Sequence, residues 1–70
     1  MRNDERIIGI VAETLGVSVS GDSSIGDVAG WDSLKTLQIV MALDEAGYGI
    51  PIEKIADVKS VRDILTFVKE

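Results

Sequence analysis

Apolar residues recur at helical spacing in three stretches of this chain. The first stretch lies between Asn3, a good N-terminal capping residue, and Gly16, a good helix terminator. The last begins at Ser60, which together with Asp63 has the spacing of a capping box. The apolar positions that define these two predicted helices are Ile7, Ile8, Val11 and Leu15 in the first, and Val61, Ile64, Leu65 and Val68 in the last.

The middle stretch predicts the longest helix, from about Asp32 to Ala46, with Gly47 ending it. At about 100° per residue, this helix has two apolar faces. The face expected to join the core holds Thr36, Ile39, Val40 and Leu43, with Ala46 beside them. The opposite face holds Leu34, Leu37 and Met41, flanked by Gln38, Asp44 and Glu45.

A helix in a bundle of 70 residues rarely buries two opposite sides. Either loop residues such as Ile25 and Val28 cover the second face, or it is exposed as a small apolar strip with a polar rim. Exposed strips of that kind mark partner sites, and a methionine within one suits an adaptable binding surface. We expect Leu37 and Met41 to be exposed, and for Leu34 the two alternatives stay open.

The segment between the first two predicted helices, residues 16–31, is rich in glycine and serine. Structureless loops of more than about 12–15 residues are uncommon in compact domains, so we expect an ordered loop anchored on the core. The expected anchors are Val17, Val19, Ile25, Val28 and Trp31. A short third helix should follow Pro51 and carry Ile52 and Ile55. The prediction is one all-α domain, residues 1–70, folded as a small bundle of three main helices and one short helix.

Composition excludes several functional classes. The chain has no cysteine and no histidine, so it lacks disulfides, thiolate or imidazole metal ligands and the usual general base. No catalytic set is present, and we expect neither an enzyme nor a metal protein. A net charge of −5 disfavours nucleic-acid binding. The polar N-terminus is unlike a signal peptide, and no apolar run reaches the roughly 20 residues of a membrane span, so we expect a cytoplasmic protein.

Ser33 is the candidate functional residue. Its hydroxyl lies at the start of the longest helix, where a phosphate group would meet the positive end of the helix dipole and free N–H groups. The competing interpretation is that Ser33 or Asp32 simply caps the helix, and local chemistry alone favours the cap. Rival modification sites are Ser18, Ser20, Ser23, Ser24 and Ser60, but none combines a helix start with a neighbouring apolar strip.

The run GWDSL at residues 30–34, with Leu37, the apolar and acidic residues 39–45 and then Ile50-Pro51, resembles the acyl carrier protein family. The resemblance covers nearly the whole chain. It implies a four-helix bundle in which a phosphopantetheinyl transferase moves 4′-phosphopantetheine from coenzyme A onto Ser33, next to Asp32. The terminal thiol of that arm then carries an acyl group as a thioester. By the same resemblance, the surface that partner enzymes recognise comprises Leu34, Lys35, Leu37, Gln38, Met41, Asp44 and Glu45.

Two departures from the usual family pattern bear on the pathway. Carriers of fatty acid synthesis usually have acids where this chain has Lys35 and Gln38, and Trp31 resembles carriers of polyketide, nonribosomal peptide and aminoacyl pathways. We therefore expect a monomeric, free-standing carrier of a dedicated pathway, although a domain excised from a larger synthase stays open. Its partners would be a loading ligase, a synthase or a transferase. The alternative is an unmodified interaction module that binds through Leu34, Leu37 and Met41.

Overall fold

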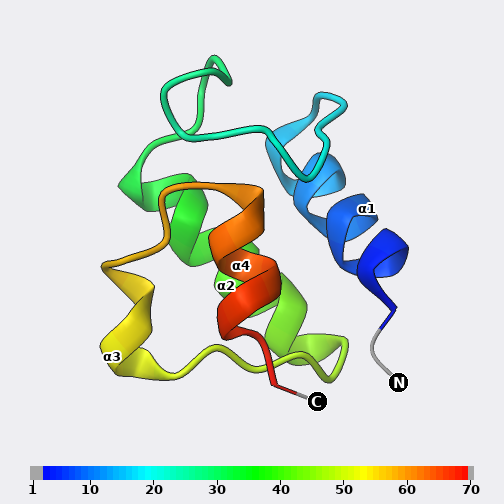
Figure 1. Ribbon diagram of the computed structural model, residues 1–70, viewed down its shortest axis with the longest axis vertical. Coiled ribbons are helices and arrows are strands. Elements are labelled where there is room, and N and C mark those ends of the chain that lie inside the picture. Colours follow the sequence, from blue (N-terminus) through cyan, green and yellow to red (C-terminus); the bar gives the residue numbers. More distant parts are fainter. Residues whose placement is uncertain (1–2, 70) are drawn as a thin grey trace.

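Four helices and no strand make up the described part of the chain, residues 3–69 of this computed structural model (Figure 1). They are α1 (Asp4–Leu15), α2 (Ser33–Glu45), α3 (Ile52–Ile55) and α4 (Val61–Phe67). Helix α2 packs against α1 and α3, and α1 also packs against α4. The prediction of a small all-α bundle with one short helix is confirmed.

The helix ends follow from local capping. The Asn3 side chain accepts a hydrogen bond from the Arg6 amide at 3.1 Å, and Gly16 ends α1 in the left-handed conformation at φ 75°. At α4 the Ser60 hydroxyl accepts from the Asp63 amide at 3.1 Å. The Asp63 carboxylate accepts in return from the Lys59 amide at 3.0 Å, one residue earlier than in a standard capping box.

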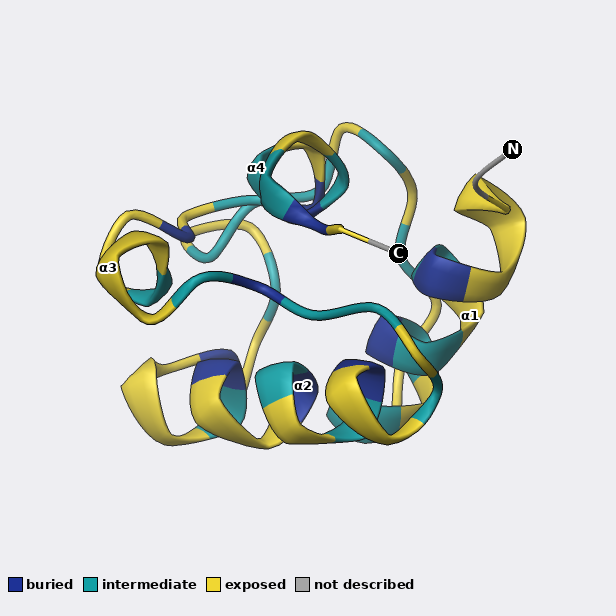
Figure 2. Cartoon of the chain, turned by 90° about the horizontal axis from the view of Figure 1, so that it is seen from below, coloured by how far each residue is buried: buried dark blue, intermediate teal, exposed yellow. Residues whose placement is uncertain are grey.

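The core gathers on the inner side of α2. Ile39 and Leu43 are fully buried there, and Thr36 is buried with them. Figure 2 shows α2 with this buried side turned toward the other helices and its exposed side turned away. The remaining core residues are Ile7, Val11, Trp31, Ile50, Val58, Val61, Ile64 and Val68.

The long loop between α1 and α2 is ordered by backbone hydrogen bonds to the segment that precedes α4. The Ile25 amide donates to the Lys59 carbonyl at 2.8 Å, and the Val61 amide donates to the Ser23 carbonyl at 2.9 Å. These bonds fix the path of the loop over the bundle in Figure 1. An ion pair between Asp22 and Arg62, at 2.6 Å, joins the same two segments, but both side chains are exposed and such pairs stabilise little.

Four of the five predicted loop anchors are correct. Trp31 is buried, and Val19, Ile25 and Val28 are partly buried against the core. The prediction for Val17 is wrong, because its side chain is 44% exposed. The Val17 amide donates to the Ala12 carbonyl at 3.3 Å, so this residue closes the C-terminal turn of α1 instead of reaching the core.

Helix α3 is a single short turn attached at the edge of the bundle. Ile55 is partly buried against the core, whereas Ile52 is 85% exposed. The Lys54 ammonium lies 5.5 Å from the centre of the Phe67 ring and so links α3 to α4. Few contacts therefore hold α3, and its position defines one wall of the pocket described below.

Candidate functional site

The start of α2 is a tightly specified turn. Gly30 has φ 86°, a left-handed conformation that side chains disfavour, and it turns the loop into Trp31. Asp32 is the N-cap, and its carboxylate accepts a hydrogen bond from the Lys35 amide at 2.9 Å. Ser33 is then the first residue of α2. Of the two residues proposed as caps from the sequence, Asp32 does the capping, which frees Ser33 from that task.

The Ser33 side chain is exposed, and its hydroxyl has no hydrogen-bond partner within residues 3–69. The amides of Ser33 and Leu34 likewise have no protein acceptor in that range, as is usual for the first turn of a helix. A free hydroxyl and two free N–H groups therefore meet at the positive end of the α2 dipole. This arrangement fits a phosphate ester on Ser33, because the ester oxygens could accept hydrogen bonds from those amides.

A buried polar contact supports the same turn from within. The Trp31 indole Nε1 donates to Thr36 Oγ1 at 2.9 Å, and Thr36 Oγ1 donates in turn to the Asp32 carbonyl at 3.1 Å. Both side chains are only 5% exposed. Thr36 was predicted on the core face and Trp31 among the loop anchors, but the hydrogen bond between them was not predicted. The sequence signal for this bond was a tryptophan five residues before a threonine on the predicted core face.

Ser33 also lies at the edge of an apolar pocket of about 470 Å³ between α2, α3 and the long loop. A single lining residue, Lys59, is charged. The full lining comprises Ile25, Ser33, Thr36, Leu37, Ile52, Ile55, Ala56, Val58 and Lys59. An apolar group attached through Ser33 would therefore find a recess close to its attachment point.

The second apolar face of α2 is exposed. Leu34, Leu37 and Met41 are 62%, 48% and 67% exposed, so the loop does not cover them, and the open question about Leu34 is resolved. Ile52 of α3 is the remaining highly exposed apolar residue near this end of the molecule, and it shares the pocket lining with Leu37 and Ser33. Exposed apolar surface of this kind marks partner-binding sites.

The polar residues predicted to flank this face are placed as expected. Gln38, Asp44 and Glu45 are exposed, and Asp32 is exposed at the cap. Lys35 is partly buried, one turn from Ser33. Along α2 the acids therefore lie at its two ends, with Asp32 beside Ser33 and with Asp44 and Glu45 at the opposite end.

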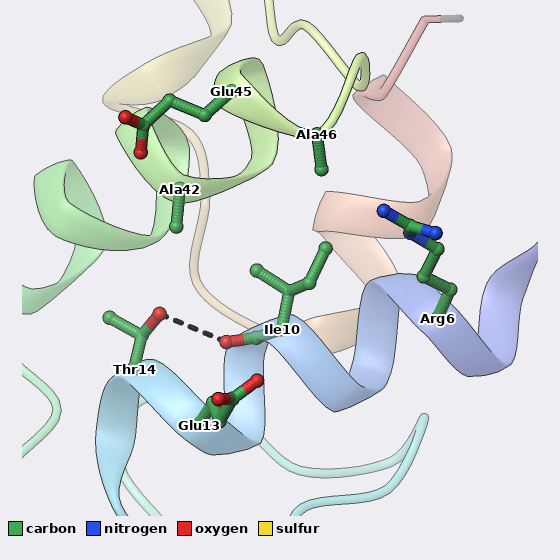
Figure 3. Close-up of a pocket in the computed structure, with 7 residues that line it drawn as sticks. All are labelled: Arg6, Ile10, Glu13, Thr14, Ala42, Glu45 and Ala46. Carbon is green, nitrogen blue, oxygen red and sulfur yellow. Dashed lines mark hydrogen bonds between the residues drawn. The ribbon is translucent and has the colours of Figure 1, made fainter.

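A second hollow lies away from Ser33, between α1 and α2. This open groove of about 540 Å³ is lined by Arg6, Ile10, Glu13, Thr14, Ala42, Glu45 and Ala46. In Figure 3 the Thr14 hydroxyl bonds to the Ile10 carbonyl of its own helix, at 2.9 Å, and the Arg6 and Glu13 side chains point away from one another. The groove does not gather polar groups on one point, so it is a weaker candidate than the pocket at Ser33.

Within residues 3–69, no group of three or more His, Cys, Asp or Glu side chains is arranged to hold a metal ion. In the same range, no helix is long and apolar enough to cross a membrane.

Comparison with known proteins agrees with this geometry. Residues 5–68 match a family model described as a phosphopantetheine attachment site. An acyl carrier protein of Rickettsia bellii (strain RML369-C) is 31% identical over 71 residues, which cover 96% of this chain and 83% of the relative. The chain belongs to the acyl carrier protein family. No solved structure gives a significant match.

Family membership confirms three predictions made from the sequence. The family resemblance itself is correct, and 4′-phosphopantetheine is the covalent cofactor of such a domain. Acyl carrier proteins are carriers and not catalysts, so this chain is not an enzyme. As a carrier it interacts with a phosphopantetheinyl transferase and with the enzymes of a pathway.

Proposed function

We propose that Ser33 is the residue to which 4′-phosphopantetheine is attached. In the attachment reaction, Ser33 Oγ forms a bond to the phosphorus of the pantetheine half of coenzyme A. The pyrophosphate bond breaks, adenosine 3′,5′-bisphosphate leaves, and a base of the transferase takes the hydroxyl proton. The observation that carries this proposal is the exposed and unbonded Ser33 hydroxyl at the first residue of α2.

The arm supplies a thiol that this cysteine-free chain lacks, and on it an acyl or aminoacyl group is carried as a thioester. The protein's own contribution is presentation. Leu34, Leu37 and Met41 offer partner enzymes an apolar surface next to Ser33, with Lys35, Gln38, Asp44 and Glu45 as its polar surroundings.

The charge of this surface favours a dedicated pathway over housekeeping fatty acid synthesis. Lys35 and Gln38 interrupt the acidic strip that would steer a basic partner toward α2. We infer a monomeric carrier in the cytoplasm that serves a specialised lipid, polyketide or nonribosomal-peptide-type pathway. Its loading enzyme would be an acyl or aminoacyl ligase, a synthase or a transferase.

The attachment is tested by incubating the protein with coenzyme A and a broad-specificity phosphopantetheinyl transferase, then measuring the intact mass. The wild type should gain one phosphopantetheinyl group and Ser33→Ala none. Ser18→Ala is the matched control, because Ser18 is also exposed but lies in the loop, and it should gain the group like the wild type. An equal gain in Ser33→Ala would refute the proposal.

A second candidate is an unmodified module that binds partners through the exposed face of α2. The exposure of Leu34, Leu37 and Met41 supports it as well. The two functions separate in a pathway assay with Ser33→Ala and Met41→Glu. The carrier requires Ser33, whereas the module would survive Ser33→Ala and fail with Met41→Glu.

A further inference from the structure

We propose that the hydrogen bond from Trp31 Nε1 to Thr36 Oγ1 positions Ser33 for modification. Trp31 and Thr36 are then positioning residues of the attachment site, and they act through the backbone of Asp32, the residue before Ser33. This inference rests on the proposed attachment at Ser33, and it adds a structural requirement for the reaction there.

The contact is a relay of two hydrogen bonds buried in the core. The indole N–H donates a hydrogen bond to Thr36 Oγ1 at 2.9 Å, and the Thr36 hydroxyl donates in turn to the Asp32 carbonyl at 3.1 Å. Thr36 is the one buried polar side chain among the described residues. A buried indole N–H needs an acceptor, and Thr36 supplies it, so each group satisfies the other.

The relay clamps the backbone on both sides of Ser33. The Asp32 carbonyl accepts from the Thr36 amide at 2.9 Å as well as from its hydroxyl, and the Asp32 carboxylate accepts from the Lys35 amide at 2.9 Å. The Trp31 amide donates to the Val28 carbonyl at 3.2 Å. Ser33 itself makes none of these bonds, so its orientation depends on its fixed neighbours while its hydroxyl stays free to react.

These hydrogen bonds matter because the loop before this turn contains glycines close to Trp31. Gly26 and Gly30 both precede Trp31 closely, and Gly30 adopts φ 86°. Glycine permits many backbone conformations, so without the indole anchor this approach to α2 would sample several of them. A misplacement of about 1 Å can slow a positioned reaction by roughly 10²-fold. A fixed turn therefore favours transfer onto Ser33.

The test uses three threonine variants of the full chain in the transferase assay with coenzyme A. Thr36→Val keeps the shape of the side chain but removes the acceptor, whereas Thr36→Ser keeps the hydroxyl. Thr14→Val is the matched control, because the Thr14 hydroxyl makes the same kind of bond to a carbonyl four residues earlier, in α1 and without an indole donor.

We expect Thr36→Val to lower kcat for modification by about tenfold, within the range that small misplacements cause, with little change in KM for the carrier. The kcat values of Thr36→Ser and Thr14→Val should stay within about twofold of the wild-type value. Circular dichroism at the assay temperature verifies that each variant is folded. Trp31→Phe, which removes the donor and leaves Thr36 intact, provides the same test if Thr36→Val does not fold.

Hydrogen exchange at the indole N–H of the single tryptophan reports on the hydrogen bond itself. If Thr36 only filled space, its replacement by valine would not change that exchange rate. In the nuclear magnetic resonance spectrum, the indole N–H of the wild type and of Thr36→Ser should exchange slowly, and that of Thr36→Val quickly. A folded Thr36→Val that is modified at the wild-type rate overturns this inference alone, as does a Thr36→Ser as slow as Thr36→Val. A wild type that gains no mass overturns the proposed function, and this inference with it.

Discussion

Two leucines on α2 allow one chemical change to be compared at a buried and at an exposed position. Leu43 is fully buried in the core, whereas Leu34 is 62% exposed on the opposite face. Truncating a buried leucine to alanine costs about 2–5 kcal/mol. Truncating an exposed one changes stability by roughly 0.5 kcal/mol or less. Both leucines are replaced by alanine, which is at least as good a helix former, so helix propensity does not separate the two variants.

The difference is large relative to the stability of so small a domain. At about 0.05–0.15 kcal/mol per residue, a 70-residue chain has a free energy of unfolding of about 4–10 kcal/mol. Leu43→Ala should therefore remove a large share of the stability. With a urea dependence of about 1 kcal/mol per molar, the unfolding midpoint should fall by roughly 2 M or more. Leu34→Ala should shift it by about 0.5 M at most.

Urea titration followed by far-ultraviolet circular dichroism and by the fluorescence of Trp31 measures both midpoints, and coincident curves justify a two-state analysis. Equal destabilisation by the two substitutions would contradict the exposed position of Leu34, because it would mean that Leu34 is packed in solution. The exposed face of α2 would then be part of the core and not a partner surface.

Three further variants test the turn, the helix end and the surface charge. Asp32→Ala removes the cap of α2 and should cost about 1 kcal/mol in a urea titration; no change would contradict the assigned cap. Gly47→Ala should cost about 1–2 kcal/mol, because Gly47 has φ 94°, and a stability equal to the wild type would argue against this helix ending. The pair Lys35→Glu with Gln38→Glu should raise the loading rate by a fatty acid synthase partner enzyme, and an unchanged rate at low salt would refute the charge argument.

The helices were predictable because their signals are local. The helix ends carry residues that act on their own turn of backbone. The side chains of Asn3 and Ser60 accept a hydrogen bond from a backbone amide, and Gly16 and Gly47 end their helices with a positive φ. Helical spacing also predicted two apolar faces on α2, and the shortness of the chain favoured exposure of Leu37 and Met41 but left Leu34 undecided. Ser33 was singled out as a helix-start hydroxyl beside that face, but local chemistry alone favoured a cap, and the attachment there is what the family resemblance implies.

The tertiary features were not predictable, because they depend on residues that are distant in the sequence. The hydrogen bonds from the Ile25 amide to the Lys59 carbonyl and from the Val61 amide to the Ser23 carbonyl fix the loop, yet they join backbone groups that carry no side-chain signal. The pocket at Ser33 exists only because α3 and the loop close two of its sides. The wrong prediction for Val17 has a simpler cause, since an apolar residue next to a helix end can stabilise the turn through its backbone amide while its side chain stays exposed.

The proposed carrier function depends on Ser33 as the tether point, and peptide mapping by tandem mass spectrometry locates that point. The protein is treated with coenzyme A and a phosphopantetheinyl transferase, digested, and each serine-containing peptide is fragmented. We expect one phosphopantetheinyl group, located on Ser33 and on no other serine. A group located on Ser18, Ser20, Ser23, Ser24 or Ser60, or no group at all, would contradict it.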